Sequence, residues 1–240
     1  MKIGPNARAL LTNLYLTWDQ GDHVLITGGT GSGKTLLAHY LDEIRVARGG
    51  SVVVFICKLR PDDTIKTYYT KKKGWVRWKT WKKFPLSREN RILLWPDVEG
   101  KTPEEAVRIM RREFRTALAQ IGSRGDWTVH IDEGLFMTAP HELGFAGTIG
   151  TMYSLMRSSK ATMITLAQRP SNLPLSIYAN TYHSFVGSAK EAGDVKRLAD
   201  LNSSISSKEM QQLIRANGMH DFLYVKSNSD EIPRKINLAQ

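Results

Sequence analysis

Residues 28–35 read Gly-Gly-Thr-Gly-Ser-Gly-Lys-Thr and match the phosphate-binding loop pattern G-x-x-x-x-G-K-[ST] at every fixed position. Glycines permit positive φ, so consecutive backbone N–H groups can turn inward around an anion. Lys34 would reach the β- and γ-phosphates of ATP, and Thr35 would bind Mg²⁺. The predicted nucleotide-binding residues are Gly28, Gly29, Thr30, Gly31, Ser32, Gly33, Lys34 and Thr35.

An acidic pair, Asp132 and Glu133, lies at the end of the apolar stretch WTVHIDEG (127–134). We expect Asp132 to hold Mg²⁺ through water, opposite Thr35. A second carboxylate beside the metal ligand can orient or deprotonate an attacking water, which hydrolysis needs and transfer to a bound acceptor does not. The pair therefore favours a hydrolase over a kinase, with Glu133 as the residue that activates water.

Two further polar residues are candidates for the same chemistry. Gln168 ends the apolar stretch ATMITLAQRP (161–170), which in the usual topology lies beside the strand of the phosphate-binding loop. There it could sense the γ-phosphate or the water, or it could simply cap the strand. Arg157 precedes it in the turn LMRSSKAT, where it could enter a neighbouring subunit's site or be one of many solvated arginines. Both are predicted catalytic residues, together with Lys34 and Glu133.

Strands and helices that would position these residues alternate along the chain, which predicts α/β layers around a mostly parallel sheet. Residues 1–22 are expected to be a lead-in, and residues 1–240 a single domain. Buried strands are predicted at 23–27, 51–57, 91–97, 127–134, 161–170 and 181–187. Helices are predicted from Lys34, over 103–120 with a capping box, in the stretch up to Ser158, and at 189–200 and 207–216. A late β-hairpin is expected from 221–227 and the segment RKINL.

Net charge indicates the kind of partner that the protein binds, and the cysteine count indicates the compartment in which it works. The 240 residues include 34 basic and 23 acidic side chains, a net charge of +11. This excess indicates an anionic partner, with nucleic acid favoured over a membrane surface. A single cysteine, Cys57, excludes an intrachain disulfide, and no apolar run approaches the length of a membrane span. A soluble protein of the cytoplasm is expected.

Several other nucleotide-binding classes lack their motifs here. No N-K-x-D is present for a guanine base, and no L-S-G-G-Q of transporter ATPases. Helicases that close two such folds around one ATP would need a second phosphate-binding loop. A motor with one fold per chain must take its second half from a neighbour, which predicts a homo-oligomeric ring with an arginine supplied in trans.

Taken together, four stretches resemble the FtsK–HerA superfamily of DNA-pumping ATPases over residues 22–226. They are GGTGSGKT, VHIDEG, RSSKATMITLAQRPS and LSIYANTYHSFVGSAKEAGDVKRLAD. The resemblance implies a three-layer, RecA-like P-loop NTPase fold and a hexameric ring acting on double-stranded DNA. It also implies that Lys34 and Thr35 bind phosphate and Mg²⁺, Asp132 the metal, Glu133 water, and that Gln168 is the sensor. Arg157 sits where coupling-type members place the trans arginine, although the turn after it, Ser-Ser-Lys-Ala-Thr, departs from the small-residue and glycine turn of the family. Arg169 and the arginines of residues 108–115 stay open as alternatives for that role.

Two basic surfaces are candidates for contact with DNA. Residues 66–83 carry eight basic and no acidic side chains, interleaved with Tyr68, Tyr69, Trp75, Trp78 and Trp81. The aromatic rings could stack on bases, or they could anchor a short insertion on the core. The 103–120 helix carries a polar stripe that could face DNA, a neighbouring subunit or only solvent: Arg108, Arg111, Arg112 and Arg115.

The sequence therefore predicts an ATP-driven DNA translocase, a bare motor domain similar to viral genome-packaging ATPases. Host cytoplasm or virion is the expected location, with a capsid or membrane partner. Two alternatives stay open: an assembly ATPase for phage extrusion at a membrane, and a nucleotide-gated DNA-binding module or small-molecule kinase.

Overall fold

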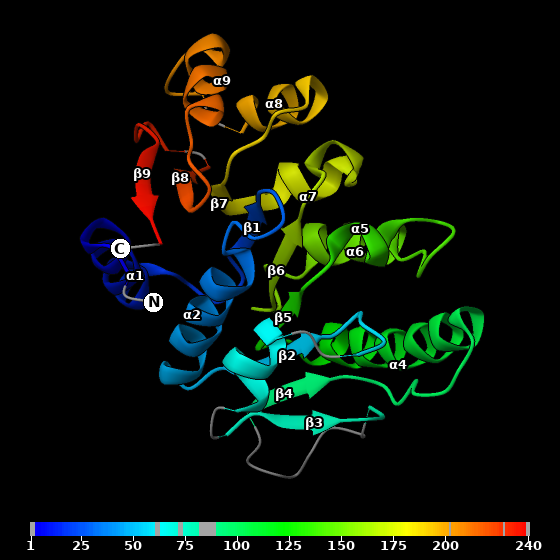
Figure 1. The fold of residues 1–240 in the computed structure, drawn as a ribbon. Helices are drawn as coiled ribbons and strands as arrows, with labels where there is room; N and C mark the ends of the chain where they lie inside the picture. Colours follow the sequence, from blue (N-terminus) through cyan, green and yellow to red (C-terminus); the bar gives the residue numbers. More distant parts are fainter. Residues whose placement is uncertain are drawn as a thin grey trace.

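The structure is a computed structural model that describes residues 3–60, 63–71, 74–81, 90–201, 203–227 and 229–238. Within this part of the chain, nine strands form one sheet in the order β3-β4-β2-β5-β6-β1-β7-β8-β9 (Figure 1). The strands are β1 (His23–Thr27), β2 (Ser51–Phe55), β3 (Val76–Trp78), β4 (Arg91–Leu94), β5 (Trp127–Ile131), β6 (Thr162–Ala167), β7 (Thr181–Val186), β8 (Asp221–Lys226) and β9 (Arg234–Asn237). The helices are α1 (Pro5–Thr17), α2 (Lys34–Ala47), α3 (Asp63–Ile65), the π-helix η1 (Lys66–Thr70), α4 (Pro103–Arg124), α5 (Gly134–Thr138), α6 (Ala146–Leu155), the 3₁₀ turn η2 (Pro170–Asn172), α7 (Leu175–Asn180), α8 (Ala192–Ala199) and α9 (Ser207–Arg215).

Strands β1 to β7 pair in parallel, and β8 and β9 run antiparallel to their neighbours. β1 lies between β6 and β7, so the segment that ends in Gln168 does neighbour the phosphate-binding loop, as predicted. β8 and β9 form the expected late hairpin. All parallel strands consequently end at the same edge of the sheet, where the loops that follow them meet.

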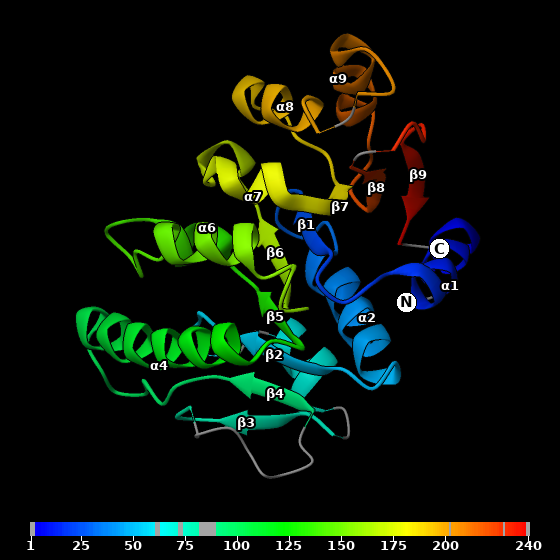
Figure 2. The same ribbon diagram turned by 180° about the vertical axis from the view of Figure 1, so that it is seen from behind.

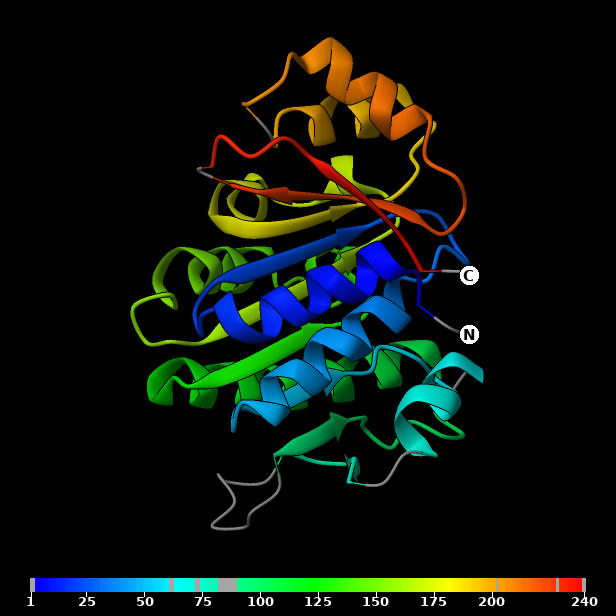
Figure 3. The ribbon, with the colours of Figure 1, turned by 90° about the vertical axis from the view of Figure 1, so that its left-hand side faces the viewer.

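Helices cover both faces of the sheet, which confirms the three-layer prediction. Within β1, Val24 and Ile26 pack with α1 and α2, whereas Leu25 points to the opposite face and packs with α4 and α6. A strand covered on both faces has no solvated side, which is why the parallel strands read as continuous apolar runs. Seen face-on to the sheet, α1 and α2 lie in front of the strands and the green helices behind them (Figure 3).

The segment expected to be a lead-in contains a helix, α1, which the sequence analysis did not predict. Pro5 stands in its first turn, a position where the missing N–H costs nothing. Its apolar face, Leu10, Leu11 and Leu14 together with Ala7, is buried. Beyond the helix, the Trp18 indole donates to the carbonyl of Asp22 at 3.0 Å. α1 thus forms part of the outer layer over α2 and stabilises the start of β1.

The basic aromatic segment packs into the core instead of presenting its tryptophans to solvent. Trp75, Trp78 and Trp81 are 9%, 1% and 7% exposed, so these rings anchor the segment and are not available to stack on bases. Residues Val76–Trp78 form the edge strand β3, which was not predicted, and Trp81 donates its backbone N–H to the buried carboxylate of Glu113 on α4 at 2.8 Å. Four of the predicted basic residues lie outside the described part: Lys72, Lys73, Lys82 and Lys83.

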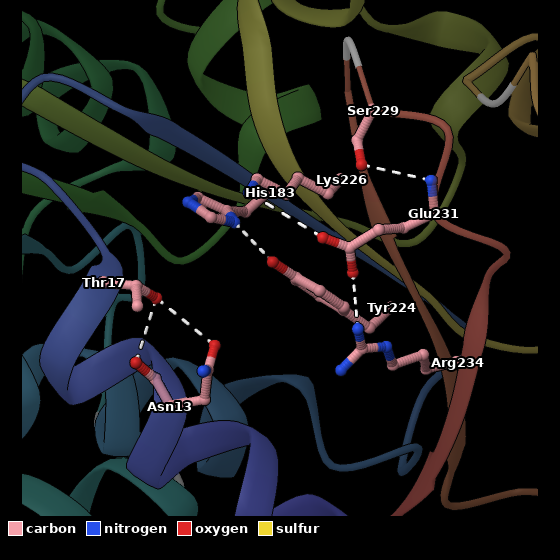
Figure 4. A network of polar contacts seen from close by, with 8 residues as sticks. All are labelled: Asn13, Thr17, His183, Tyr224, Lys226, Ser229, Glu231 and Arg234. Carbon is pink, nitrogen blue, oxygen red and sulfur yellow. Dashed lines mark hydrogen bonds and ion pairs between the residues drawn. The ribbon is translucent and has the colours of Figure 1, made fainter.

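The end of the sheet that carries β7, β8 and β9 is closed by α8, α9 and a polar network. Val186, Leu223 and Val225 pack against α8 and α9, which gather at that end (Figure 2). Figure 4 shows the polar part of the hairpin, where the Tyr224 hydroxyl lies 2.8 Å from Nδ1 of His183 on β7. Glu231 pairs with Arg234 at 2.6 Å in the same network. Across the described residues, no helix has the length and apolar character needed to cross a bilayer.

Candidate nucleotide-binding site

The loop between β1 and α2 has the backbone that a phosphate cradle requires. Gly28, Gly31 and Gly33 have φ of 151°, 77° and 97°, and Gly33 is the left-handed N-cap of α2. A Cβ atom at Gly28 would lie 2.9 Å from the Ser32 hydroxyl oxygen, whereas one at Gly29 would meet nothing within 4 Å. The first N–H groups of α2 have no helical partner, so the loop offers an anion both these donors and the positive end of the helix dipole.

Lys34 lies folded across its own loop. Its ammonium donates to the carbonyl oxygens of Gly28 at 2.8 Å and Gly29 at 2.9 Å. Burial lowers the pKa of Lys34, while the carboxylates of Glu133 and Asp132 act in the opposite direction. These two carbonyl bonds satisfy the ammonium at the position where the phosphates of a nucleotide would need it.

Thr35 and Asp132 meet as predicted. The Thr35 hydroxyl donates to Oδ1 of Asp132 at 3.3 Å, and the Asp132 side chain is only 4% exposed. Mg²⁺ takes oxygen ligands and keeps several waters, so one hydroxyl and one carboxylate fit it, provided that a substrate phosphate completes the set. In the ranges that the structure describes, no cluster of three or more His, Cys, Asp or Glu side chains offers an all-protein metal site.

Gln168 links the phosphate-binding loop to Glu133. Its amide oxygen accepts from the Thr30 hydroxyl at 3.0 Å, and its amide nitrogen donates to Oε2 of Glu133 at 3.4 Å. Burial raises the pKa of Glu133, and the negative charge of Asp132 adds to this effect. A carboxylate with a raised pKa, held by an amide at the mouth of a phosphate cradle, has the arrangement needed to accept a proton from water.

Two cations lie beside this site, and one of them, Lys58, was not predicted from the sequence. Lys58, three residues after the end of β2, forms an ion pair with Oδ2 of Asp132 at 3.1 Å. Arg169 pairs through Nε with Asp194 of α8 at 3.1 Å. Arg169 and Gln168 line a cavity of about 510 Å³ next to Gly29 and Thr30. No motif marks Lys58, because only the pairing of β2 with β5 brings it to Asp132.

Arg157 lies near the amino-terminal end of β1, whereas the phosphate-binding loop follows the carboxyl-terminal end of that strand. Its guanidinium is 3.7 Å from Asp22, which immediately precedes β1, and its side chain is 69% exposed. The loop follows β1, so a five-residue strand of roughly 15 Å separates the two positions. Arg157 is therefore not brought together with the other predicted catalytic residues of its own chain.

The other arginines considered for a trans role have different surroundings. Arg111 donates to the carbonyl oxygens of Leu143 and Glu142 and so holds the connection between α5 and α6. Arg169 lies at its own chain's phosphate-binding loop. Three members of the α4 stripe are exposed: Arg108, Arg112 and Arg115.

This sheet order, with a glycine-rich loop between β1 and α2 and an acidic pair after β5, defines an α/β P-loop NTPase fold. No family model and no curated protein matches the sequence. Among solved structures, the DNA-packaging ATPase B204 of Sulfolobus turreted icosahedral virus superposes with a TM-score of 0.64 at 16% identity, over 92% of this chain and 100% of that one.

Two further structures share the fold. The genome-packaging NTPase B204 of Sulfolobus turreted icosahedral virus 2, in complex with ATP-gammaS, has a TM-score of 0.62 at 15% identity, over 92% and 99% of the two chains. VirB4 of Thermoanaerobacter pseudethanolicus has a TM-score of 0.65 at 10% identity, over 91% of this chain and 89% of that one. These likenesses confirm the predicted three-layer P-loop NTPase fold.

Proposed function

We propose that this protein is an ATPase that moves DNA, in the manner of a genome-packaging motor. The observation that carries the hydrolytic part is the line of hydrogen bonds from Thr30 through Gln168 to Glu133. This line joins the phosphate cradle to a carboxylate positioned to act on water. Phosphoryl transfer to a bound acceptor does not need a carboxylate that acts on water, whereas hydrolysis does.

Each residue has a defined part in the proposed reaction. The Lys34 ammonium exchanges its two carbonyl partners for the β- and γ-phosphates of ATP. Thr35 and Asp132 would hold Mg²⁺, which would neutralise charge on the phosphates. Glu133 accepts a proton from the attacking water, and Gln168 orients Glu133 and reports on the γ-phosphate through Thr30. The raised pKa of Glu133 brings its basicity closer to what proton abstraction needs.

DNA is the proposed partner, for two reasons. The chain carries a net charge of +11, which suits a polyanion. It also shares its fold, end to end, with a protein described as a DNA-packaging ATPase. Double-stranded DNA in a viral or related packaging reaction is the substrate that we favour.

We further propose that the active form is a ring, of six subunits by analogy with the FtsK–HerA motors. Within one chain, no described arginine bonds to Glu133, Asp132 or the phosphate-binding loop in the contacts given above. The exposed position of Arg157 at the far end of the sheet is suited to entering a neighbour's site, where its charge would stabilise the transition state.

Steady-state ATP hydrolysis tests this function when it is measured without nucleic acid, with linear duplex and with single strands. The Lys34→Ala variant serves as the blank. We expect several-fold stimulation by duplex. If DNA left the rate of ATP hydrolysis unchanged and the protein bound no DNA at low salt, the proposal would be refuted and the extrusion ATPase favoured.

A further inference from the structure

Lys58 is a cation inside the nucleotide site that the roles described above do not use. It follows β2, and its backbone carbonyl accepts from the Trp95 indole at 3.1 Å, which fixes the main chain there. Its ammonium lies 3.1 Å from Oδ2 of Asp132, and its side chain is 31% exposed. The other oxygen of Asp132 accepts from Thr35. Asp132 thus links Lys58 to Thr35 of the phosphate-binding loop.

The ion pair satisfies a requirement of the site before nucleotide arrives. A carboxylate with 4% exposure needs a cation or hydrogen-bond donors, because an isolated buried charge is costly. Lys58 supplies that cation on one oxygen, and Thr35 supplies a donor on the other. Both oxygens of the predicted metal ligand are therefore engaged by side chains of this chain.

Binding of a nucleotide with its metal removes the reason for that pairing. A divalent ion held by Asp132 would neutralise the carboxylate in place of the ammonium and would repel the ammonium, since like charges at short range destabilise each other. Two anions then remain within reach of the ammonium, the Glu133 carboxylate and the terminal phosphate, and the phosphate carries the greater charge. The lysine side chain is a flexible four-carbon stem that carries a compact charge. Its ammonium can therefore change partner by rotation about the side-chain bonds, without movement of the backbone.

We propose that Lys58 is a γ-phosphate-binding residue: its ammonium neutralises Asp132 in the nucleotide-free protein and transfers to the terminal phosphate of ATP. This inference rests on the proposed nucleotide binding but not on DNA translocation. It assigns to the end of β2 a cis cation that distinguishes a triphosphate from a diphosphate. Lys34, by contrast, would contact the β-phosphate, which ATP and ADP share, as well as the γ-phosphate, which only ATP has.

The test compares the affinities of ATPγS and ADP, each with Mg²⁺, for the wild type and for Lys58→Met by isothermal titration calorimetry. We expect the dissociation constant of ATPγS to rise about ten-fold and that of ADP to change less than about three-fold, a ten-fold loss being 1.4 kcal/mol. Lys58→Arg keeps the charge and should retain most of the preference for ATPγS. The matched control is Lys226→Met, because Lys226 is 33% exposed and also pairs with a carboxylate, Glu231, far from the site (Figure 4).

Equal loss of both nucleotides in Lys58→Met, or no loss of either, would overturn the proposal and leave Lys58 as a structural partner of Asp132. If the wild type itself binds neither nucleotide, the proposed function fails as well, so the two failures are distinguishable.

A second measurement needs no variant and covers the case in which Lys58→Met does not fold. Wild-type protein is acetylated with a lysine-selective ester, and the modification of each lysine is read by mass spectrometry. We expect Lys58 to be protected more strongly by ATPγS than by ADP, with Lys226 unchanged by either. Equal protection by both nucleotides, or none, would contradict a contact with the γ-phosphate.

Discussion

Replacement of Glu133 by glutamine removes the proposed base and little else. The substitution keeps the size of the side chain, and its amide oxygen can still accept from Gln168 Nε2, which lies 3.4 Å from Oε2 of Glu133. What is lost is the ability to take a proton from water. General-base catalysis contributes about 10²–10⁴ in rate. At about 1.36 kcal/mol for each factor of ten, the barrier rises by about 2.7–5.4 kcal/mol.

The assay pairs phosphate release with binding of ATPγS. We expect kcat of Glu133→Gln to fall by at least about 100-fold, while the affinity for ATPγS changes little, because Glu133 has no bond to the phosphate-binding loop except through Gln168. The control is Glu191→Gln, an exposed carboxylate that lines the neighbouring cavity. If kcat fell less than about five-fold, or if binding fell in step with it, Glu133 would not be the base.

The remaining predictions concern the trans arginine, acid stability and the core. Arg157→Ala and Lys34→Ala should each be inactive alone, and mixing them should restore hydrolysis, since one supplies an intact nucleotide site and the other an intact arginine. Burial lowers the pKa of His23 to about 4 and that of His183 to about 3. The unfolded chain binds protons at both below pH 6.5, so the free energy of unfolding, measured with urea, should fall by up to about 2.7 kcal/mol per pH unit between pH 6.5 and 4. Phe114→Ala should cost about 3–5 kcal/mol in the same assay, because Phe114 is fully buried and stacked on Phe55 at 4.7 Å.

Each of these has an outcome that would contradict it. Mixed subunits as inactive as the separate variants would argue against Arg157 in trans. A stability that does not change between pH 6.5 and 4, or a decline that His183→Gln leaves unaltered, would show that the buried histidines are not its source. A loss below about 1 kcal/mol for Phe114→Ala would mean that the interface of α4 with the sheet is not tightly packed.

The parallel strands and the phosphate-binding loop could be predicted because their signals are local. Ser51–Phe55 is an unbroken β-branched run, as a strand buried on both faces must be. The capping box of Thr102 and Glu105 also marked the start of α4, and both of its hydrogen bonds are present. Lys34, Thr35, Asp132, Glu133 and Gln168 follow strand ends, which a parallel sheet brings to one edge.

The features that the sequence did not reveal depend on contacts between distant segments. α1 has an apolar face whose contribution to stability comes from packing on α2, a contact that the local sequence does not show. β3 is three residues long and exists because β4 offers it a partner. Its tryptophans stood among lysines, as stacking residues would, and only burial distinguishes an anchor from a DNA contact. Lys58 belongs to the site because β2 pairs with β5.

The central claim is that ATP hydrolysis drives movement along DNA, and displacement of a third strand from a linear duplex tests it most directly. A triplex-forming oligonucleotide is placed at some distance from the duplex end, and its release is followed with ATP, with ATPγS and with the Glu133→Gln variant. We predict release by the wild type with ATP alone, and later release as the distance from the end grows. Release that needs no hydrolysis, or none at all from a protein whose ATPase is active, would contradict a translocase.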